Sequence, residues 1–511
     1  MIIGIDEIKT VLAEHRLLAQ VIDNGSEKFR AVTFDSRRVS NETLFFCKGN
    51  FRPEYLASAK AAGATGYVSE REYEEGSELT AIIVTDIQKA MALIGAAFYG
   101  YPQNDLFIVA VTGTKGKTTT AYFTHGIFAE TTDDKTALFS TVDRILGPAP
   151  EQQFKSDLTT PESLDLFHDM REAVDSGMTH LVMEVSSQAY KRNRVYGLTY
   201  DVGIFLNITP DHIGPNEHPT FEDYLLCKEQ VLVNSTCCII NAETDHLADV
   251  YYAAKTSSQP ENVYLFARKG AEIALDVPVD FWYNNDSETL HKSEFDLRAA
   301  TNKAAKLDQI SGHYEVGIAG NYNEGNAVAA LIASALDGVD HESAYDKLEA
   351  VRVPGRMETV VSDNHGTIYI DYAHNYASVH ALLEFLKGQT HAGRVIIVVG
   401  SPGNKGESRR AGFGQAISEE ADVAVLTTDD PGYEDPMAIA KQIDDHIDHG
   451  KVDVIFELDR PTAIKKAIEM STGDDIVVLA GKGEDPYQKV KGVDTPYPTD
   501  VIIAKEVVKG L

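Results

Sequence analysis

The chain has 511 residues, 43% of them hydrophobic, and a formal net charge of −32 at pH 7. This length can bury several hydrophobic cores, so it predicts three domains rather than one. The strong negative charge argues against nucleic acid and anionic membranes as partners, because both would repel the protein.

Targeting segments and cysteine usage indicate the cellular compartment. Asp6 and Glu7 stand where a signal peptide would need an apolar core, and no apolar run approaches the ~20 residues of a membrane-spanning helix. The four cysteines show neither zinc spacing nor a disulfide framework, which fits a reducing compartment. We therefore expect a cytoplasmic protein, and we expect it to be a monomer.

The first hundred residues mix short apolar runs with helical stretches. A helix is predicted over 53–64 and a strand over 81–84, and the Gly, Pro and Asn of 98–105 are typical of a linker. We interpret residues 1–100 as a small N-terminal α/β domain.

A second unit follows this linker. Short β-rich runs alternate with helical segments, a pattern that favours a mostly parallel sheet. The predicted strands cover 106–111, 180–185, 202–206 and 237–240. We interpret residues 101–350 as a central P-loop-type domain.

The third unit repeats the alternation from residue 351 to residue 511, which predicts a Rossmann-like α/β domain. Its predicted strands cover 395–399, 423–426, 452–456 and 476–480. The expected fold class is therefore α/β with three domains.

The strongest chemical signal is "AVTGTKGKTTTAYF" (110–123), which joins a predicted strand to a predicted helix through a glycine turn. Phosphate needs close backbone approach, a cation and a hydroxyl for Mg²⁺, which Gly113 and Gly116, Lys117 and Thr118 would supply. A standard Walker A motif would have glycine at Val111, so the spacing differs from that of an ordinary nucleotide-hydrolysing enzyme.

Two further segments carry polar residues behind predicted strands. Glu184 ends an apolar strand, where α/β proteins collect ligands, and needs a cation or a hydrogen bond there. Asp211, His212 and His218 follow the next strand and could form a zinc site, although adjacent Asp and His suit a closed cage poorly. A hard cation held with phosphates suits them better.

A helix is predicted over 221–232, with Phe221, Leu225 and Leu232 on one stripe. By this pattern alone, Lys228 is interpreted as a solvent-exposed surface lysine.

Seven motifs in chain order resemble those of the Mur ligases, most of all the MurE type. They extend over nearly the whole chain and are "FYGYPQNDLFIVAVTGTKGKTTTA", "DLTTPES", "MEVSSQAYKRNRVYG", "FLNITPDHI", "GNYNEGNAVAA", "VPGRME" and "IDYAHNYASV". The resemblance implies three α/β domains that bind a uridine nucleotide, ATP and an amino acid respectively.

Matched by motif, the resemblance implies a nucleotide and metal site. Lys117, Glu184, His212, Lys228 and Arg356 would be catalytic. ATP would contact Gly113, Thr114, Lys115, Gly116, Lys117, Thr118, Thr119, Asn323, Arg356, Asp371 and His374, with Asn326 near the base. Mg²⁺ would be held by Thr118, Glu184, His212 and Lys228, the last as N6-carboxylysine. Carbon dioxide would turn the Lys228 amine into an anion with oxygen ligands for Mg²⁺, and lysine shifts its pKa readily toward the neutral form that this needs.

The other substrate implied is UDP-N-acetylmuramoyl-L-alanyl-D-glutamate. Its matched contacts are Ser36, Arg37, Thr159, Thr160, Ser186 and Arg194. Gln188 stands where the family usually has His, and Lys115 replaces the commoner Asn. Two extra residues also separate His212 from His218 relative to many members.

The implied reaction is amide formation through an acyl phosphate. ATP would activate a carboxylate, an amine would attack it, and phosphate would leave, while the protein aligns three substrates and screens their charges. Closure of the ATP domain on the amino-acid domain predicts hinge motion near 345–355.

The stretch "TTDDPGYEDP" (427–436) bears on the amino acid. Family members that add meso-diaminopimelate carry Asn-Pro-Arg after the first Asp, and that arginine can bind a distal carboxylate. Here Asp430, Pro431 and Gly432 follow Asp429. The predicted amino-acid contacts are Asp429, Asp430, Gly481, Glu484 and Asp485, with Glu434 a further candidate. Such acids would attract a distal ammonium, which predicts L-lysine; L-ornithine is the nearest alternative and meso-diaminopimelate another.

Two other functions fit parts of the sequence. Folylpolyglutamate synthetases share the scaffold, but the "TFDSRRV" segment before the phosphate loop has no place in them. A non-catalytic nucleotide-binding regulator is disfavoured because Lys117, Glu184, His212 and Lys228 are all intact.

Overall fold

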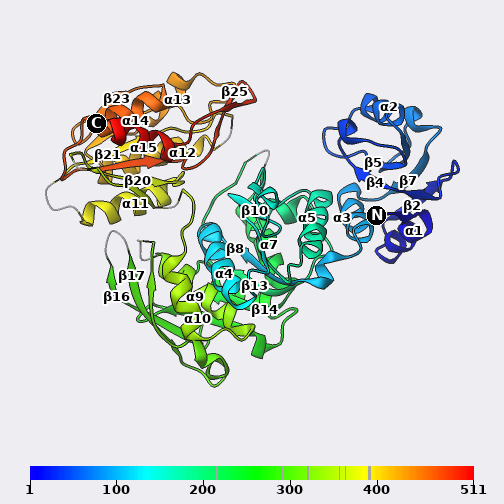
Figure 1. The fold of residues 1–511 in the computed structure, drawn as a ribbon, viewed down its shortest axis with the longest axis horizontal. Helices are drawn as coiled ribbons and strands as arrows, with labels where there is room; N and C mark the ends of the chain where they lie inside the picture. The colour runs from blue at the N-terminus through cyan, green and yellow to red at the C-terminus, as the bar shows by residue number, and fades with distance from the viewer. Residues whose placement is uncertain are drawn as a thin grey trace. The chain divides into compact units, whose positions relative to one another are not determined.

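The computed structural model describes residues 1–214, 217–288, 292–318, 322–355, 357–362, 364–389, 393–404 and 406–510. Within these residues, three large β-sheets follow one another along the chain, and helices flank each of them (Figure 1). The predicted α/β class with three sheet-containing parts is confirmed. The domain boundaries at residues 100 and 350 stay predictions.

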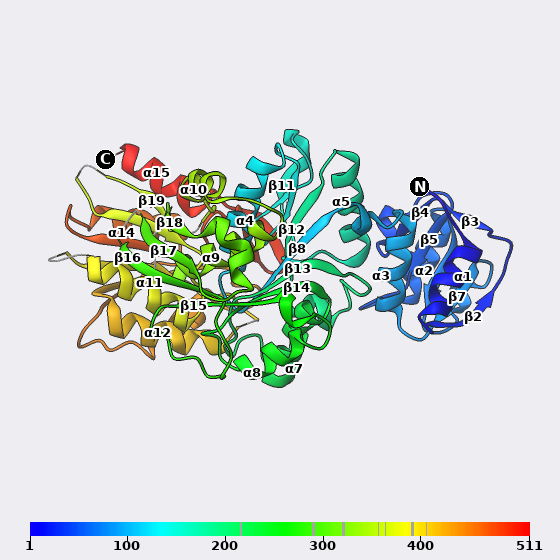
Figure 2. The same cartoon turned by 90° about the horizontal axis from the view of Figure 1, so that it is seen from below.

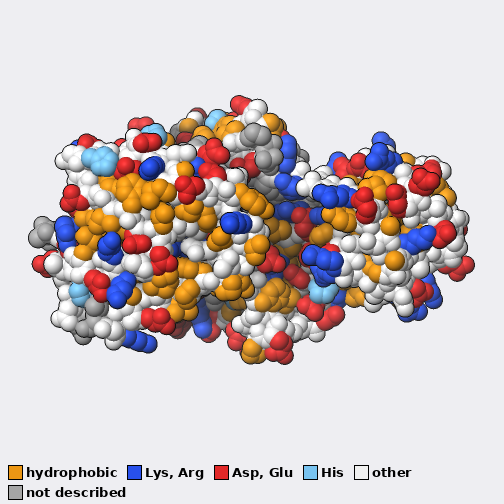
Figure 3. All heavy atoms as spheres, turned by 90° about the horizontal axis from the view of Figure 1, so that it is seen from above, with side chains coloured by type: hydrophobic (Ala, Val, Ile, Leu, Met, Phe, Trp, Pro, Cys, Tyr) orange, Lys and Arg blue, Asp and Glu red, His pale blue; other side chains and the backbone are white. Residues whose placement is uncertain are grey.

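The chain divides into two compact units, each described here by itself. One comprises Met1–Asn284, Asp296–His313 and Gly325–Leu348, and the other comprises Asn285–Phe295, Tyr314–Glu324 and Glu349–Leu511. Among the described residues, no helix combines the length and apolar character that crossing a membrane requires. Acidic and basic side chains are interspersed over the face that Figure 3 presents.

The N-terminal sheet has five strands in the described residues, and it is parallel except at the edge strand β2. In spatial order the strands are β2 (Leu18–Ile22), β7 (Thr80–Val84), β6 (Ala64–Ser69), β5 (Thr43–Phe46) and β4 (Ala31–Thr33). Alternate side chains bury opposite faces of the sheet. Leu44 and Ile82 pack toward α1 (Ile5–Glu14) and α3 (Ile87–Phe98), whereas Phe45 packs toward α2 (Pro53–Ala61). A two-stranded ribbon of β1 (Ile3–Gly4) and β3 (Lys28–Phe29) accompanies it.

The central sheet has eleven strands in the described part of the chain. In order they are β11 (Gln153–Lys155), β10 (Asp143–Ile145), β9 (Thr136–Phe139), β12 (His180–Glu184), β8 (Phe107–Thr112), β13 (Tyr200–Phe205), β14 (Ser235–Asn241), β15 (Val263–Arg268), β16 (Phe281–Glu288), β17 (Ser293–Ala299) and β18 (Gly312–Val316). From β9 through β16 neighbouring strands are parallel, as the sequence predicted. Parallel strands end together at one edge, so the loops after β8, β12 and β13 meet there.

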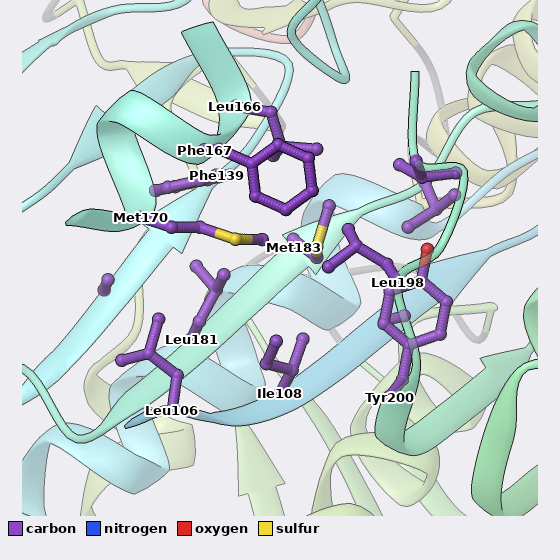
Figure 4. Close-up of a cluster of buried hydrophobic side chains, with 14 of the residues drawn as sticks. Leu106, Ile108, Phe139, Leu166, Phe167, Met170, Leu181, Met183, Leu198 and Tyr200 are labelled. Atoms are coloured by element: carbon purple, nitrogen blue, oxygen red, sulfur yellow. The ribbon is translucent and has the colours of Figure 1, made fainter. Parts of the chain in front are cut away.

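Helices cover both faces of this sheet, as parallel sheets require. They are α4 (Lys117–Thr131), α5 (Ser163–Asp175), α6 (Ser187–Lys191), α7 (Phe221–Val233), α8 (Leu247–Ala254), α9 (Tyr322–Leu336) and α10 (His341–Ala350). Figure 4 shows Phe167 and Met170 of α5 lying over Leu181 and Met183 of β12. On another part of the sheet, α4 and α9 lie beside each other (Figure 1 and Figure 2). The buried packing of α5 fixes the strand that ends in Glu184.

The C-terminal sheet has six strands among the described residues, parallel except at β19. Their order is β19 (Glu358–Val360), β20 (Thr367–Asp371), β24 (Ile476–Ala480), β21 (Val395–Val399), β22 (Val423–Leu426) and β23 (Asp453–Phe456). The helices are α11 (Tyr376–Gln389), α12 (Ser408–Glu420), α13 (Pro436–Asp444), α14 (Arg460–Glu469) and α15 (Asp500–Gly510), and a hairpin of β25 (Tyr487–Val490) and β26 (Val493–Pro496) projects near the end. Every residue of β21, β22 and β24 is buried. This burial explains why the sequence predicted these strands as continuous apolar runs.

Candidate functional site

A glycine-rich turn connects β8 to α4, as the phosphate-loop motif predicts. Gly116 has φ +84°, a left-handed conformation that L side chains rarely adopt. A Cβ at this position would also clash with the side-chain amide of Asn326 in the first turn of α9. Glycine is therefore required twice over, by the backbone and by the packing of α9.

The loop after β13 braces this turn through paired hydrogen bonds. The Thr114 N–H donates to Asn207 O at 3.0 Å, and the Lys115 N–H donates to Asn207 Oδ1 at 2.9 Å. The Asn207 side chain donates back to Lys115 O at 3.1 Å, and the Thr209 N–H donates to Thr114 Oγ1 at 3.0 Å. A loop held in this way is already shaped before any ligand arrives.

Two lysine amino groups converge on one carbonyl of the turn. Lys117 Nζ donates to Gly113 O at 2.9 Å and to Thr114 O at 3.2 Å, and Lys228 Nζ donates to Gly113 O at 2.6 Å. The charge of Lys117 so close by disfavours a second positive charge on Lys228, and an anion beside the two groups would offset the charge they carry. The site is thus suited to an anionic ligand.

The interpretation of Lys228 as a surface lysine is wrong: its relative exposure is 2%. Its Nζ lies 4.8 Å from the centre of the Tyr224 ring, on the same helix, and the Tyr224 hydroxyl lies 3.1 Å from Thr114 Oγ1. Burial, followed by the charge of Lys117, holds the pKa of Lys228 well below its ordinary value. The helical stripe was read correctly, but its neighbouring face packs on the phosphate loop instead of facing water.

Glu184 lies at the end of β12, fully buried, opposite Val111 of β8. Its carboxylate accepts hydrogen bonds from the Thr141 N–H at 2.7 Å and from Thr141 Oγ1 at 3.0 Å. The sequence predicted that Glu184 needs either a cation or a hydrogen bond, and the structure shows these two hydrogen bonds. The two interactions orient the carboxylate without adding a positive charge to it.

The two histidines after β13 have different partners. His212 Nδ1 lies 2.6 Å from Glu217 Oε1, and the His212 side chain is 40% exposed. His218 is fully buried, with Nδ1 2.6 Å from Asp223 Oδ2 and Nε2 2.9 Å from Ser187 Oγ. Their ring nitrogens face separate acids, which disfavours the alternative zinc site built from both. Ligand atoms of His218, Asp223 and Cys227 lie within 4.8 Å of one another.

The residues around the turn fit the donor set of a hard cation. Thr118 offers a hydroxyl on the buried first turn of α4, and Glu184 offers a carboxylate oriented by Thr141. Hydroxyl, carboxylate and phosphate oxygens are the ligands that Mg²⁺ prefers, and a carbamate on Lys228 would add two more oxygens. The chemistry of these donors is therefore compatible with Mg²⁺.

The predicted dipeptide contacts form a connected polar cluster. Thr160 Oγ1 donates to Glu184 O at 3.0 Å and accepts from the Ser186 N–H at 3.1 Å. Arg194 donates to Thr160 O at 3.2 Å and pairs with Glu162 at 2.8 Å. Lys48 of the N-terminal part also pairs with Glu162. The site assigned to the peptide is thus tied to both Glu184 and the N-terminal part.

The remaining predicted contacts of this substrate are more exposed. Thr159 Oγ1 lies 3.0 Å from Thr141 Oγ1 and can donate to it, which links Thr159 to the residue that supports Glu184. Ser36 and Arg37 lie on a short 3₁₀ turn, where Arg37 forks onto the Asp35 carboxylate at 2.7 and 2.9 Å. The Arg37 side chain is 87% exposed.

The predicted nucleotide contacts of α9 and the C-terminal unit are only partly described. Asn323 and Asn326 are buried in the first turns of α9, and Arg356 lies outside the described residues. Asp371 accepts from the Met357 N–H at 3.0 Å and the Ala373 N–H at 2.8 Å, so it ties Met357 to the end of β20. His374 Nδ1 lies 2.7 Å from Tyr372 O.

The acidic stretch after β22 surrounds a lysine that the sequence interpretation missed. Lys482 is 1% exposed, and its Nζ lies 2.7 Å from Asp430 Oδ1, 3.0 Å from Asp485 Oδ2 and 3.7 Å from Asp429 Oδ1. Burial raises the pKa of Asp429, and the Lys482 charge opposes that rise. We name Asp429, Asp430, Asp485 and Lys482 the acid–lysine cluster. Three carboxylates around one ammonium leave an excess of negative charge.

Two other acids of this region have different surroundings. Glu434 pairs with Arg410 at 2.9 Å, and this hydrogen bond lowers the pKa of Glu434. Its charge is therefore already compensated. The Glu484 N–H donates to the Tyr372 hydroxyl at 3.0 Å, and Gly481, with φ +99°, lies next to Asp429.

Comparison with known proteins identifies the family of the chain. A model of the Mur ligase middle domain matches residues 111–334, and a model of the Mur ligase glutamate ligase domain matches residues 355–483. A protein of Ligilactobacillus salivarius (strain UCC118) named UDP-N-acetylmuramyl-tripeptide synthetase is 64% identical over 511 residues, and the match covers 100% of both chains. The chain belongs to the Mur ligase family. The resemblance seen in the motifs is confirmed.

Other Mur ligases match with lower identity. The UDP-N-acetylmuramoyl-L-alanyl-D-glutamate--L-lysine ligase of Enterococcus faecalis (strain ATCC 700802 / V583) is 49% identical over 486 residues, which cover 95% of this chain and 92% of that protein. A solved UDP-N-acetylmuramoyl-L-alanyl-D-glutamate--2,6-diaminopimelate ligase aligns with TM-score 0.65 at 24% identity over 100% of this chain and 99% of that one, which supports the fold. This Mur ligase is an ATP-binding ligase of peptidoglycan synthesis.

Sequence reasoning missed three supporting residues of this Mur ligase. Thr141 orients Glu184, Tyr224 lies between Lys228 and Thr114, and Lys482, from the loop after β24, pairs with the acidic stretch. The signal for Lys482 was its position next to Gly481 and two residues before Glu484 in a segment already singled out. Thr141 lies in a loop with no motif, so only the fold reveals it.

Proposed function

We propose that this Mur ligase uses ATP to join L-lysine to UDP-N-acetylmuramoyl-L-alanyl-D-glutamate, as the third amino acid of the peptide. The family and the full-length relatives named tripeptide synthetase support the coarser part of this proposal. The acid–lysine cluster is the observation that carries the choice of lysine. The lysine-specific name of the relative from Enterococcus faecalis agrees with it.

The reaction begins with an unreactive carboxylate. ATP phosphorylates the free carboxylate of the dipeptide substrate, which gives an acyl phosphate with a good leaving group. The amine of lysine attacks the acyl carbon, and the tetrahedral intermediate collapses to the amide with release of phosphate. Lys117 and the turn 113–116 bind the ATP phosphates, while Thr160, Ser186 and Arg194 orient the peptide.

Mg²⁺ supplies charge neutralisation for the phosphates when it is bound. Thr118, Glu184, His212 and a carbamylated Lys228 would hold it. The lowered pKa of Lys228 supports the modification, because carbon dioxide reacts with a neutral amine. Asn323, Asp371, His374 and Arg356 stay predictions for the nucleotide, as do Ser36, Arg37 and Thr159 for the uridine substrate.

Charge distinguishes the candidate amino acids. L-Lysine carries a distal ammonium, whereas meso-diaminopimelate carries a distal carboxylate as well. The excess negative charge of the acid–lysine cluster attracts the first and repels the second. L-Ornithine has the same charge but is one methylene shorter, a difference typically worth ~1–3 kcal/mol.

Amino-acid competition tests the choice of substrate. The wild-type enzyme is expected to use lysine in preference to ornithine and to reject meso-diaminopimelate, measured by phosphate release and by the mass of the product. Asp430→Asn is expected to raise the KM for lysine about tenfold, because a charge-assisted hydrogen bond becomes a neutral one. Asp453→Asn, an exposed acid of β23, is the matched control and should leave the KM unchanged. Equal use of meso-diaminopimelate, or an unaltered KM in Asp430→Asn, would contradict the proposal.

Phosphate release also separates the rival functions. A folylpolyglutamate synthetase would need a folate and would ignore the muramoyl dipeptide, and a non-catalytic regulator would release no phosphate with any amino acid.

A further inference from the structure

Lys482 has an unusual environment for a lysine of this chain. Its side chain is 1% exposed, and its ammonium faces carboxylates from two loops, one after β22 and one after β24. A buried ammonium is costly unless it is paired, and here the pairing is complete. The lysine therefore links the two loops from which the predicted amino-acid contacts come.

Two donors bind the same carboxylate oxygen of Asp430. Lys482 Nζ donates to Asp430 Oδ1 at 2.7 Å, and the Lys489 N–H of the β25–β26 hairpin donates to the same oxygen at 3.0 Å. On the other loop, Asp485 uses Oδ2 for Lys482 and Oδ1 for the Tyr487 N–H at 3.2 Å. Both carboxylates thus have fixed orientations, and the two hydrogen bonds of Asp430 fall on one oxygen.

We propose that Lys482 is a positioning residue for amino-acid selection: it holds Asp430 and Asp485 so that Asp430 Oδ2 is presented to the distal ammonium of the substrate. This inference rests on the proposed lysine-adding function and deepens it. Three carboxylates packed together without a counter-charge could not all stay ionised. Lys482 offsets part of their negative charge and orients Asp430 and Asp485, while the remaining negative charge is available to a second ammonium.

A direct role of Lys482 toward a substrate carboxylate is disfavoured by its geometry. An ammonium has three N–H donors. Two of them face Asp430 and Asp485 within 3.0 Å, and the third carboxylate, of Asp429, lies at 3.7 Å. The side chain therefore cannot take the place of the arginine that diaminopimelate-adding members carry, because its donors face the protein's own acids.

The test compares two amino acids that differ only in the distal charge. Norleucine has the carbon chain of lysine without the ammonium, so the ratio of kcat/KM for lysine to that for norleucine isolates recognition of the charge. Lys482→Met keeps the length of the side chain and removes its ammonium, and we expect it to lower this ratio at least about tenfold. Lys482→Arg keeps the charge and is expected to restore part of the ratio. Lys489→Met is the matched control, because only the backbone of Lys489 contacts Asp430.

A purely structural role would predict a different pattern. Loss of packing would lower kcat/KM for both amino acids equally and leave their ratio unchanged in Lys482→Met, a result that would overturn the inference. Should that variant fail to fold, Asp485→Asn provides the second measurement. It weakens the hydrogen bond that holds the Lys482 ammonium beside Asp430, so Asp430 is positioned less well and the same ratio should fall. An unchanged ratio in Asp485→Asn would also contradict the proposal.

The wild-type enzyme distinguishes this inference from the proposed function. Equal use of lysine and meso-diaminopimelate by the wild type would reject the lysine-adding function itself. Selective use of lysine by the wild type, together with a full lysine-to-norleucine ratio in Lys482→Met, would reject the role of Lys482 alone.

Discussion

Replacing Lys228 by alanine is expected to lower ligation by about a hundredfold or more, because the change removes the carbamate that we propose as an anionic ligand of Mg²⁺. The buried amine, with its pKa lowered by burial and by Lys117, is the form that takes up carbon dioxide. Added formate or acetate should restore part of the activity, since a short carboxylate can enter the vacated space and supply the missing oxygens. Steady-state phosphate release with and without the added anion measures both effects.

A surface lysine provides the control for this experiment. Lys255, which is exposed at the end of α8, should tolerate the same substitution with unchanged activity and no response to formate. Full activity in Lys228→Ala would contradict the assignment. So would the absence of carbamate from the native protein, measured by intact mass in bicarbonate buffer.

Replacing Lys117 by alanine is expected to stop acyl-phosphate formation itself, with a loss of about a hundredfold or more. Lys117 Nζ lies over the carbonyls of Gly113 and Thr114, at the turn that would cradle the phosphates. His212→Ala should act on the same half-reaction, because His212 is assigned to Mg²⁺ beside those phosphates. The measurement is isotope exchange between ATP and ADP that depends on the dipeptide substrate and needs no amino acid.

Retained exchange in either variant would place the defect in amine attack and would contradict the assignment. Asp430→Asn is the informative comparison, since it should leave the exchange intact while changing the use of lysine. Lys135→Ala, an exposed lysine before β9, should change neither measurement.

The sequence by itself determined the buried strands, the glycine turn and the family to which the motifs belong. Fully buried parallel strands such as β21, β22 and β24 appear as unbroken apolar runs, because both of their faces need apolar side chains. The glycine turn 113–116 could also be predicted from the sequence, because the left-handed backbone of Gly116 and its contact with Asn326 favour glycine at that position. Family resemblance then supplied the roles of residues whose motifs are intact.

Only the tertiary structure decided which buried charged side chains lie next to each other. Lys228 has the spacing of a surface residue on its helix, and it is buried because α7 packs against the phosphate loop more than a hundred residues earlier in the chain. The acidic stretch after β22 looked like uncompensated charge, yet Lys482 returns from the loop after β24, two strands away across the sheet. Helical and strand periodicity report burial along one element, whereas the pairing of buried charges depends on distances between elements, which local sequence does not encode.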